Sequence, residues 1–305
     1  MIPKKVALIA TDWPTYEKYC PNFTGMMDGL EKLEIEHQLF SCRPQLRVSD
    51  VIEYEPDFII YGLLDMVKHP EWREEIKEKL PNAKIVMWYG DLRDNTTGQI
   101  NADMSEIDMM FVSNNAQEEF YKRKWKVKEC KFLPLGASIK NVEYDAHFDF
   151  DFVFLGSKIT GSSFMDRALE IGLYQQQGLK LINADAQRFP TLRAKILKTM
   201  PTIYRSSKIC LDISHFTNID GYTSNRYWNI SASGGVALTK RFPGCEKFYP
   251  EDSRIYFDTF EEAIKKKNYY LKHPEKLEPI RKRALEVAKL HEYTERFLEM
   301  FKAVY

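Results

Sequence analysis

Short apolar runs alternate with amphipathic segments along the whole chain. In the first half the apolar runs are Val6–Ala10, His37–Phe40, Asp57–Tyr61, Lys84–Tyr89, Met109–Val112 and Lys131–Leu133. Helical patterns lie between several of them, at Gly25–Leu33, Glu71–Leu80 and Asn115–Lys124. Strands that alternate with crossover helices predict a parallel sheet with helices on both faces. Residues 1–143 are therefore predicted to form a Rossmann-like domain.

The same alternation restarts after a polar, aromatic stretch at Asn141–Phe150, which we interpret as a linker. The later apolar runs are Phe152–Leu155, Leu179–Asn183, Ile209–Ile213, Val236–Thr239 and Ile255–Phe257. They predict a second Rossmann-like domain over residues 150–286, and a returning C-terminal helix over residues 287–305 is expected to brace the first domain. Two doubly wound α/β domains predict a ligand cleft at the carboxyl ends of the strands.

Composition narrows the class of protein. The 305 residues are 44% hydrophobic and 29% charged, as in ordinary globular proteins. The 44 basic and 44 acidic side chains cancel, so no global field attracts nucleic acid or membranes. The five cysteines form no CxxC pair, which indicates reduced thiols. Because the N-terminal apolar run is too short for a signal peptide and no window could span a membrane, a cytoplasmic protein is predicted.

The stretch NRYWNISASGGVALTK, Asn225–Lys240, carries the most informative polar pattern. A helix that begins here, after a polar cap at Thr223 or Ser224, offers free N–H groups and a positive dipole end to a phosphate. Arg226 and Asn229 are three residues apart and therefore lie on one helix face.

From that face the guanidinium of Arg226 could bind a diphosphate, and the amides of Asn225 and Asn229 could bind sugar hydroxyls. The pair Gly234-Gly235 is expected to end the helix and to let it pack close to the next strand. The alternative is a capped helix whose arginine is merely solvated.

Acidic residues follow several predicted strands of the first domain. Asp91 ends the strand that reads WYG and enters a long polar loop, Leu92–Asn101. A carboxylate at the carboxyl end of a central strand points into the cleft, where it could bind or deprotonate an acceptor hydroxyl. Asp12 and Asp65 hold comparable positions, and each of the three could instead cap a helix or form a turn.

No metal site is predicted. The six histidines show no metal-ligand spacing. Asp149-Phe150-Asp151 spells DxD, a divalent-metal motif of a different fold, but it lies before a strand rather than in that fold's context. The basic segment Tyr121–Lys131 is interpreted as a solvated helix end, although it could contact an anionic acceptor such as DNA.

The stretch from Tyr204 to Phe301 resembles the CgeB/YkvP-type, spore-protein-like glycosyltransferase family of GT-B fold. Ser207-Lys208 matches the start of the family's strand. The family's R-T-F-E-x-x-A-S-G helix is matched by Arg226-Tyr227-Trp228-Asn229 and Ala232-Ser233-Gly234. Its later motifs are matched by Thr239, Pro243-Gly244, Phe248, Tyr270–Glu275 and His291–Arg296. The N-terminal half shows only two short similarities to the family, at Gly25 and at Pro134–Gly136. One departure is clear: the glutamate that related enzymes use to hold the donor ribose is Asn229 here. The partner acidic position falls on Gly221, beside Asp220.

The resemblance implies a set of donor-site residues. It makes Gly156 and the loop after it face the donor phosphates, with Lys158 as a charge partner. Lys208 and Arg205 are further candidates for neutralising the leaving group. The nucleotide is expected near Arg226, Asn229 and Ser233-Gly234-Gly235.

The sequence thus predicts a metal-independent glycosyltransferase. It would transfer a sugar from a nucleotide-diphosphate donor, a UDP-sugar, to a hydroxyl acceptor that is a small molecule, a glycan or modified DNA. No other cofactor is expected, and the catalytic candidates are Asp91, Arg226 and Lys208. Two alternatives stay open: a phage-type enzyme that glycosylates a hydroxylated DNA base, and a non-catalytic two-lobed protein that binds nucleotide sugars.

Overall fold

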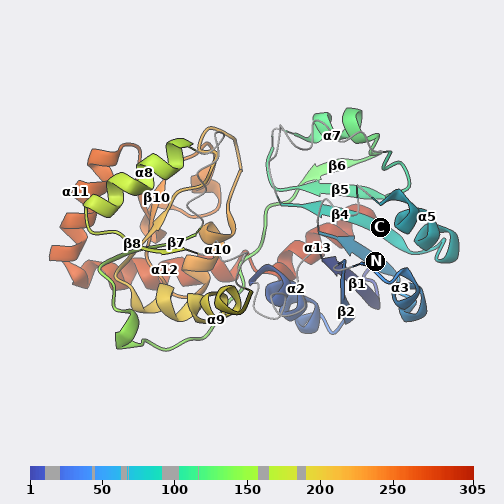
Figure 1. The fold of residues 1–305 in the computed structure, drawn as a ribbon, viewed down its shortest axis with the longest axis horizontal. Coiled ribbons are helices and arrows are strands. Elements are labelled where there is room, and N and C mark those ends of the chain that lie inside the picture. The colour runs from blue at the N-terminus through green and yellow to red at the C-terminus, as the bar shows by residue number, and fades with distance from the viewer. Residues whose placement is uncertain are drawn as a thin grey trace. The chain divides into compact units, whose positions relative to one another are not determined.

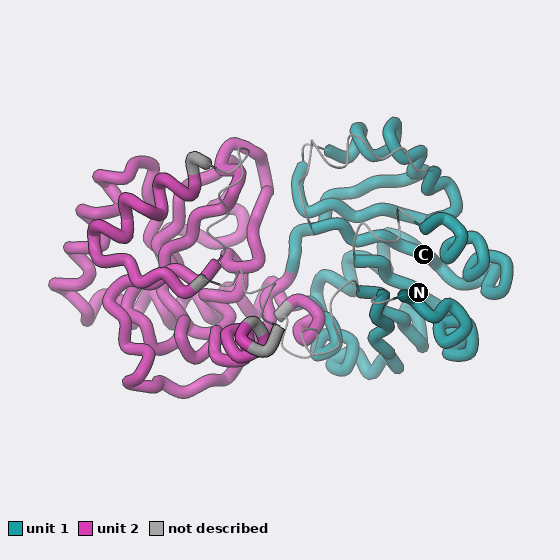
Figure 2. Tube along the Cα trace, viewed as in Figure 1, with its two compact units in different colours: residues 1–17, 26–135, 293–305 teal, residues 18–25, 136–292 magenta. Residues whose placement is uncertain are grey.

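A computed structural model describes residues 1–10, 21–42, 45–62, 67, 69–90, 103–115, 117–156, 165–183 and 190–305. The chain divides into two compact units, which Figure 2 colours separately. Unit 1 comprises residues 1–17, 26–135 and 293–305, and unit 2 comprises residues 18–25 and 136–292. Each unit is built around one parallel sheet.

Unit 1 contains a six-stranded parallel sheet with the order β2-β1-β3-β4-β5-β6 (Figure 1). Its strands are β1 (Lys5–Ala10), β2 (Glu36–Ser41), β3 (Phe58–Tyr61), β4 (Lys84–Tyr89), β5 (Met109–Val112) and β6 (Cys130–Phe132). Its helices are α2 (Pro21–Lys32), which begins in unit 2, α3 (Val48–Tyr54), α5 (Pro70–Lys79), α7 (Glu118–Trp125) and α13 (Tyr293–Val304).

Unit 2 contains a five-stranded parallel sheet with the order β11-β10-β9-β7-β8. Its strands are β7 (Phe152–Gly156), β8 (Lys180–Asn183), β9 (Ile209–Asp212), β10 (Ala237–Lys240) and β11 (Ile255–Phe257). Its α-helices are α8 (Met165–Gln176), α9 (Pro190–Ser206), α10 (Asn225–Ala232), α11 (Phe260–Lys272) and α12 (Leu277–Lys289). Short 3₁₀ turns lie at Ala146–Phe148, Cys245–Lys247, Glu251–Ser253 and Pro274–Lys276.

Most strands of both sheets are buried on both faces, which explains their nearly continuous apolar sequences, whereas the edge strands β2, β6 and β8 are partly exposed. In unit 2, alternate strand residues contribute to two cores. Val153 and Leu155 of β7 pack with Ile203 of α9 and Ile230 of α10. Phe154, on the opposite face, packs in a core with residues of α8, α11 and α12. Helices therefore cover both faces of the sheet.

Every predicted strand is present, within one residue at each end. The predicted linker contains the short turn Ala146–Phe148. The last helix, α13, belongs to unit 1, where Phe301 packs edge-on against Phe58 with ring centres 5.1 Å apart. Within the described residues, no helix combines the length and apolarity needed to cross a bilayer.

Candidate donor site

The carboxyl edge of the unit 2 sheet is where a helix with polar residues begins. The chain leaves β9 at Asp212, and α10 starts at Asn225. Ser224 occupies the N-cap position with an extended backbone, but its side chain makes no capping hydrogen bond. The hydroxyl of Thr223 instead accepts a hydrogen bond from Trp228 Nε1 at 3.0 Å. The helix therefore begins as predicted, without the predicted side-chain cap.

Arg226 is buried at this edge and spans two strands. Its Nε donates to the carbonyl oxygen of Leu155 at 2.9 Å, and its Nη1 donates to that of Ile213 at 2.9 Å. The guanidinium also lies over the ring of Phe154, 4.1 Å from its centre. These contacts hold the guanidinium at the carboxyl ends of β7 and β9, so the residue is not the solvated arginine of the alternative reading.

Gly156 makes the close approach of Arg226 possible. A Cβ atom at Gly156 would lie 2.5 Å from Arg226 Nη2 and 2.8 Å from the Phe154 ring. No side chain larger than hydrogen fits there without moving the arginine. The structure thus brings together two predicted donor-site residues, Gly156 and Arg226, at the end of β7.

A buried carboxylate lies beneath Arg226. Asp212 Oδ1 is 3.9 Å from Arg226 Nη1, and Asp212 Oδ2 accepts a hydrogen bond from Arg254 Nη1 at 3.1 Å. Burial raises the pKa of Asp212, while the positive charges of Arg254 and Arg226 oppose that rise. Two arginines and one carboxylate therefore share the interior behind the carboxyl edge.

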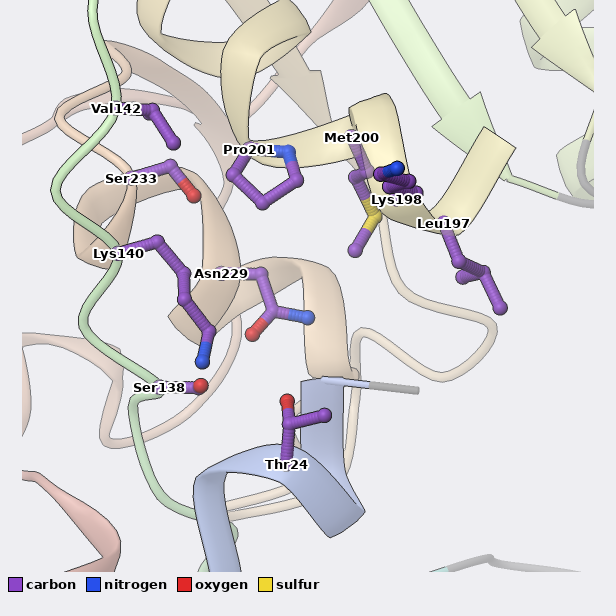
Figure 3. Close-up of a pocket in the computed structure, with 10 residues that line it drawn as sticks. All are labelled: Thr24, Ser138, Lys140, Val142, Leu197, Lys198, Met200, Pro201, Asn229 and Ser233. Carbon is purple, nitrogen blue, oxygen red and sulfur yellow. The ribbon is translucent and has the colours of Figure 1, made fainter. Parts of the chain in front are cut away.

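A cavity of about 240 Å³ opens against the same face of α10 (Figure 3). The residues that line it are Thr24, Ser138, Lys140, Val142, Leu197, Lys198, Met200, Pro201, Asn229 and Ser233. Figure 3 shows the amide of Asn229 near the centre of this lining, between Lys140 and the helix that carries Pro201. The volume is below the range of about 300–1,000 Å³ that is typical of whole-ligand sites, so it suits one ring-sized group.

Arg226, Asn229 and Ser233 follow one another along α10 at spacings of three and four, which places them on one face. Arg226 lies at the carboxyl edge and the other two line the cavity. Asn225 is exposed at the first helical position. A ligand with a diphosphate at Arg226 and a ribose at Asn229 would follow this face.

The acidic position of the related enzymes is also at this edge. Gly221 donates its backbone N–H to the carbonyl of Pro243 at 3.2 Å. The carboxylate of Asp220 lies directly against Gly244, which has a positive φ of 80°. Gly221 has no acidic side chain at this position, but the neighbouring residue, Asp220, carries a carboxylate.

Other predicted residues lie at the opposite end of the sheet. Lys208 precedes β9, and its ammonium pairs with Asp151 at 2.6 Å at the amino edge. In a parallel sheet the amino edge lies opposite the carboxyl edge, so Lys208 does not lie near Arg226 and Gly156. Arg205 lies in the last turn of α9 and packs against Gly234, where a Cβ atom would lie 3.2 Å from the arginine Cδ. Hence neither of these cations lies beside Gly156.

Gly234 and Gly235 terminate α10 at the amino edge, as predicted for a helix end. Gly234 has a φ of 72°. Its N–H donates to the carbonyl oxygen of Ser231, and the N–H of Gly235 donates to the carbonyl oxygen of Ile230. This pattern is a Schellman motif. A Cβ atom at Gly235 would lie 2.9 Å from the carbonyl oxygens of Ile230 and Tyr204. The two glycines thus end α10 and allow its close packing, and their assignment to the donor site stays a prediction.

Four predicted residues lie outside the described part of the chain: Asp91, the favoured acceptor carboxylate, its alternatives Asp12 and Asp65, and Lys158. Their assignments remain predictions. Among the described residues, no group of three or more His, Cys, Asp or Glu side chains could hold a metal ion. Asp151 of the DxD sequence pairs with Lys208.

Comparison with known proteins gives a family match to part of the chain and a fold for the whole of it. Residues 182–302 match a family described as "Glycosyl transferase-like". No curated protein sequence matches the chain. The matched segment includes β9, α10 and β10, and with them Arg226, Asn229 and Asp212.

Solved structures resemble the whole chain at low sequence identity. An α-glucosyltransferase in complex with UDP has a TM-score of 0.71 and 9% identity, with 99% of each chain covered. An α-glucosyltransferase bound to UDP and a 13-mer DNA that contains an HMU base has a TM-score of 0.66 and 9% identity, with full coverage of both chains. Anabaena HepE in complex with UDP and glucose has a TM-score of 0.56 and 10% identity, with 98% of this chain and 100% of that chain covered.

These likenesses confirm the predicted GT-B fold. With the family match, they also confirm the predicted class of enzyme, a glycosyltransferase. The fold, the arginine at the carboxyl edge and the cavity on α10 are the features of the described chain that bear on its donor.

Sequence reasoning missed two parts of this region. Most of the cavity lining comes from the segment after β6 and from α9, which the sequence does not connect to α10. The buried pair Asp212 and Arg254 was also missed, although a carboxylate at the end of the apolar strand Ile209–Asp212 is unusual. Asp212 at the end of this apolar strand was the feature of the sequence that could have indicated a buried ion pair.

Proposed function

We propose that the protein is a glycosyltransferase whose donor is a UDP-sugar bound by unit 2. The observation that carries this proposal is the position of Arg226, which is fixed against Gly156 at the carboxyl ends of β7 and β9. Ligands of open α/β sheets bind at this edge. Two structures of the same fold contain UDP, and a third protein of this fold was solved with UDP and glucose.

In this proposal Arg226 and the first N–H groups of α10 bind the diphosphate. Asn229 replaces the glutamate of the CgeB/YkvP-type family, to which we assign the chain, and its amide bonds the ribose in the cavity. Asp220, which is next to Gly221 in the sequence, is proposed to contact the sugar. A guanidinium and helix amides neutralise a departing diphosphate without a metal ion, so we propose metal-independent transfer.

The reaction exchanges one bond at the anomeric carbon. The bond from that carbon to the β-phosphate oxygen breaks, and the acceptor oxygen forms a new bond to the same carbon. The acceptor proton passes to a base, for which Asp91 remains the prediction, and UDP departs with the electron pair of the broken bond. Charge therefore develops on the diphosphate, where Arg226 is proposed to act.

The test is calorimetric titration of the wild-type protein and Arg226→Gln with UDP-glucose, followed by transfer assays with and without EDTA. Removing a charge-assisted hydrogen bond predicts a roughly tenfold or greater fall in affinity, since such bonds contribute about 1.5–3 kcal/mol. Arg283→Gln, an exposed arginine of α12 that pairs with Asp252, is the matched control and should bind normally. Equal affinity of folded Arg226→Gln and wild-type protein would refute the assignment, and loss of transfer in EDTA would refute metal independence.

A second candidate concerns the acceptor. The two α-glucosyltransferase structures, one of them bound to DNA, resemble the chain with TM-scores of 0.66 and 0.71. In unit 1 the end of α7 and the residues after it expose Arg123, Lys126, Lys128 and Lys131. Lys126 pairs with Asp103 at 2.7 Å. A hydroxymethylated base in DNA is the acceptor that these observations favour.

This candidate predicts binding to a duplex that falls steeply with salt. Replacing Lys128 and Lys131 with glutamine should weaken binding and flatten its salt dependence, by about 0.9 in the logarithmic slope for each phosphate that is no longer neutralised. Lys265→Gln, an exposed lysine of unit 2, serves as the control. Transfer to small hydroxyl acceptors but not to hydroxymethylated DNA would exclude the candidate.

A further inference from the structure

Three charged side chains form a cluster in the interior of unit 2: Asp212, Arg226 and Arg254, which we call the buried charge cluster. The exposed fractions of their side chains are 2%, 8% and 0%. Asp212 ends β9, Arg226 lies in the first turn of α10, and Arg254 immediately precedes β11. Three separate elements thus place their charges together beneath the carboxyl edge of the sheet.

Arg254 is the most extensively bonded member. Its Nη1 donates to Asp212 at 3.1 Å and to Thr239 at 3.2 Å. Its Nη2 donates to the hydroxyl of Ser231 at 2.9 Å and to the carbonyl of Tyr227 at 2.5 Å, both in α10.

The guanidinium of Arg254 also lies against two aromatic rings, 3.9 Å from the centre of Tyr227 and 4.1 Å from that of Tyr249, whose planes meet at 81°. Stacking and hydrogen bonds together fix its orientation. Arg254 therefore holds both the helix that carries Arg226 and the carboxylate that faces Arg226.

The cluster contains two positive charges and one negative charge. Asp212 directs Oδ2 to Arg254 at 3.1 Å, whereas its Oδ1 lies 3.9 Å from Arg226 and has no hydrogen-bond partner among the described residues. Arg254 is therefore the closer partner of Asp212. Burying ions costs free energy that only a good partner offsets. One positive charge, on the side of Arg226 and Gly156, remains for a bound anion.

We propose that Arg254 is a positioning residue for the donor diphosphate. Arg254 engages Asp212 and keeps this carboxylate from neutralising Arg226, so the charge of Arg226 stays available at the end of β7. This inference rests on the proposed function, because it takes the anion at Arg226 to be the donor diphosphate. It assigns to Arg254 and Asp212 a role in donor affinity, although neither faces the ligand.

The proposal predicts opposite effects for two single variants. In Arg254→Gln, Asp212 is free to pair with Arg226, and the affinity for UDP-glucose should fall about five- to tenfold, as expected for one charge acting at short range in a partly screened interior. In Asp212→Asn, the carboxylate is removed and affinity should rise by about the same factor. A purely structural role would weaken binding in both variants.

The double variant Asp212→Asn/Arg254→Gln gives the sharpest contrast. It leaves Arg226 as the one charge of the cluster, so its affinity should return to within about threefold of the wild-type value. Removing Asp212 thus restores the binding that is weakened in Arg254→Gln. A structural role predicts that the double variant binds no better than Arg254→Gln.

Arg73→Gln is the matched control for destabilisation. Arg73 is a buried arginine of unit 1, 1% exposed, and it pairs with Glu106. Its replacement should lower the stability of the fold and leave the affinity for UDP-glucose unchanged.

The measurement is calorimetric titration of all five proteins with UDP-glucose and with inorganic diphosphate, with folding checked by circular dichroism.

If Asp212→Asn does not fold, the comparison of Arg254→Gln with the double variant decides. Unchanged or weaker binding by folded Asp212→Asn, no rescue in the double variant, or failure of all three cluster variants to fold would overturn the proposal. If the wild-type protein binds diphosphate but not UDP-glucose, the proposed donor is wrong while the cluster is still tested by diphosphate. Binding of neither ligand would refute both.

Discussion

At the residue scale, Arg226 has a structural role and, in the proposed function, also binds the donor. Two of its nitrogens donate to carbonyl oxygens at the ends of β7 and β9, which removes the entropic cost of ordering the side chain when a ligand binds. Its Nη2 lies against Gly156, on the side of the strand end. A preorganised donor of this kind stabilises developing charge better than a mobile surface lysine does.

Gly156→Ala tests this residue-scale account. The added methyl group would lie 2.5 Å from Arg226 Nη2 and should displace the guanidinium. We expect a roughly tenfold loss of UDP-glucose affinity, the size of one charge-assisted hydrogen bond. Titration calorimetry measures it.

The control is Gly172→Ala in α8, where a Cβ atom meets no neighbour within 4 Å. It should bind UDP-glucose normally and gain about 0.5–1 kcal/mol of stability, because alanine is the better helix former. Normal binding by folded Gly156→Ala would show that its packing against Arg226 is irrelevant to the donor.

The same scale shows what the sequence could and could not predict about the site. Arg226 was predicted from the start of a helix that follows an apolar run, whereas Gly156 was placed at a strand end by the apolar pattern and in the donor site by the family resemblance. Lys208 was placed in the site through family resemblance, but it precedes its strand and therefore lies at the amino edge, paired with Asp151. The contacts of Arg254 join segments up to 42 residues apart, and no local pattern predicts such contacts.

At the scale of elements, prediction succeeded most fully for the strands. Both sheets are parallel and most of their strands are covered on both faces, so these strands appear in the sequence as compact apolar runs between polar turns. The ends of helices were harder to predict, because they depend on side-chain contacts that the pattern of apolar residues does not specify. At α10 the N-cap residue Ser224 makes no side-chain cap, and the Thr223 hydroxyl accepts a hydrogen bond from Trp228 instead.

Helix α11 shows the opposite case and gives an element-scale prediction. The hydroxyl of Thr259 accepts a hydrogen bond from the N–H of Glu262 at 3.2 Å, and the Glu262 carboxylate accepts one from the N–H of Asp258 at 2.8 Å. Thr259→Ala should therefore lower the free energy of unfolding of unit 2 by about 1 kcal/mol. Urea denaturation measures this change.

Thr259→Ser keeps the capping oxygen and should retain most of the stability. UDP-glucose affinity should be unchanged in both variants, because α11 contributes none of the residues assigned to the donor. A Thr259→Ala protein as stable as the wild type would mean that the cap contributes nothing to unit 2.

At the scale of the whole molecule, the two units have separate sheets and separate cores. The residues assigned to the donor, Gly156, Arg226 and Asn229, belong to unit 2, as does the cavity on α10. The fold class followed from the two successive sets of apolar runs. Asp91 and its loop, predicted to contact the acceptor, lie outside the described residues.

The most direct test of the central claim is hydrogen–deuterium exchange with and without UDP-glucose. A ligand slows exchange where it stabilises the folded state against local opening. Binding at the carboxyl edge of unit 2 predicts the strongest protection in peptides that cover residues 152–156 and 213–233, which contain the end of β7, the loop after β9 and all of α10. Peptides of β1, β2 and α3 in unit 1 should change little. Protection confined to unit 1, with residues 213–233 unaffected at saturating UDP-glucose, would contradict the account.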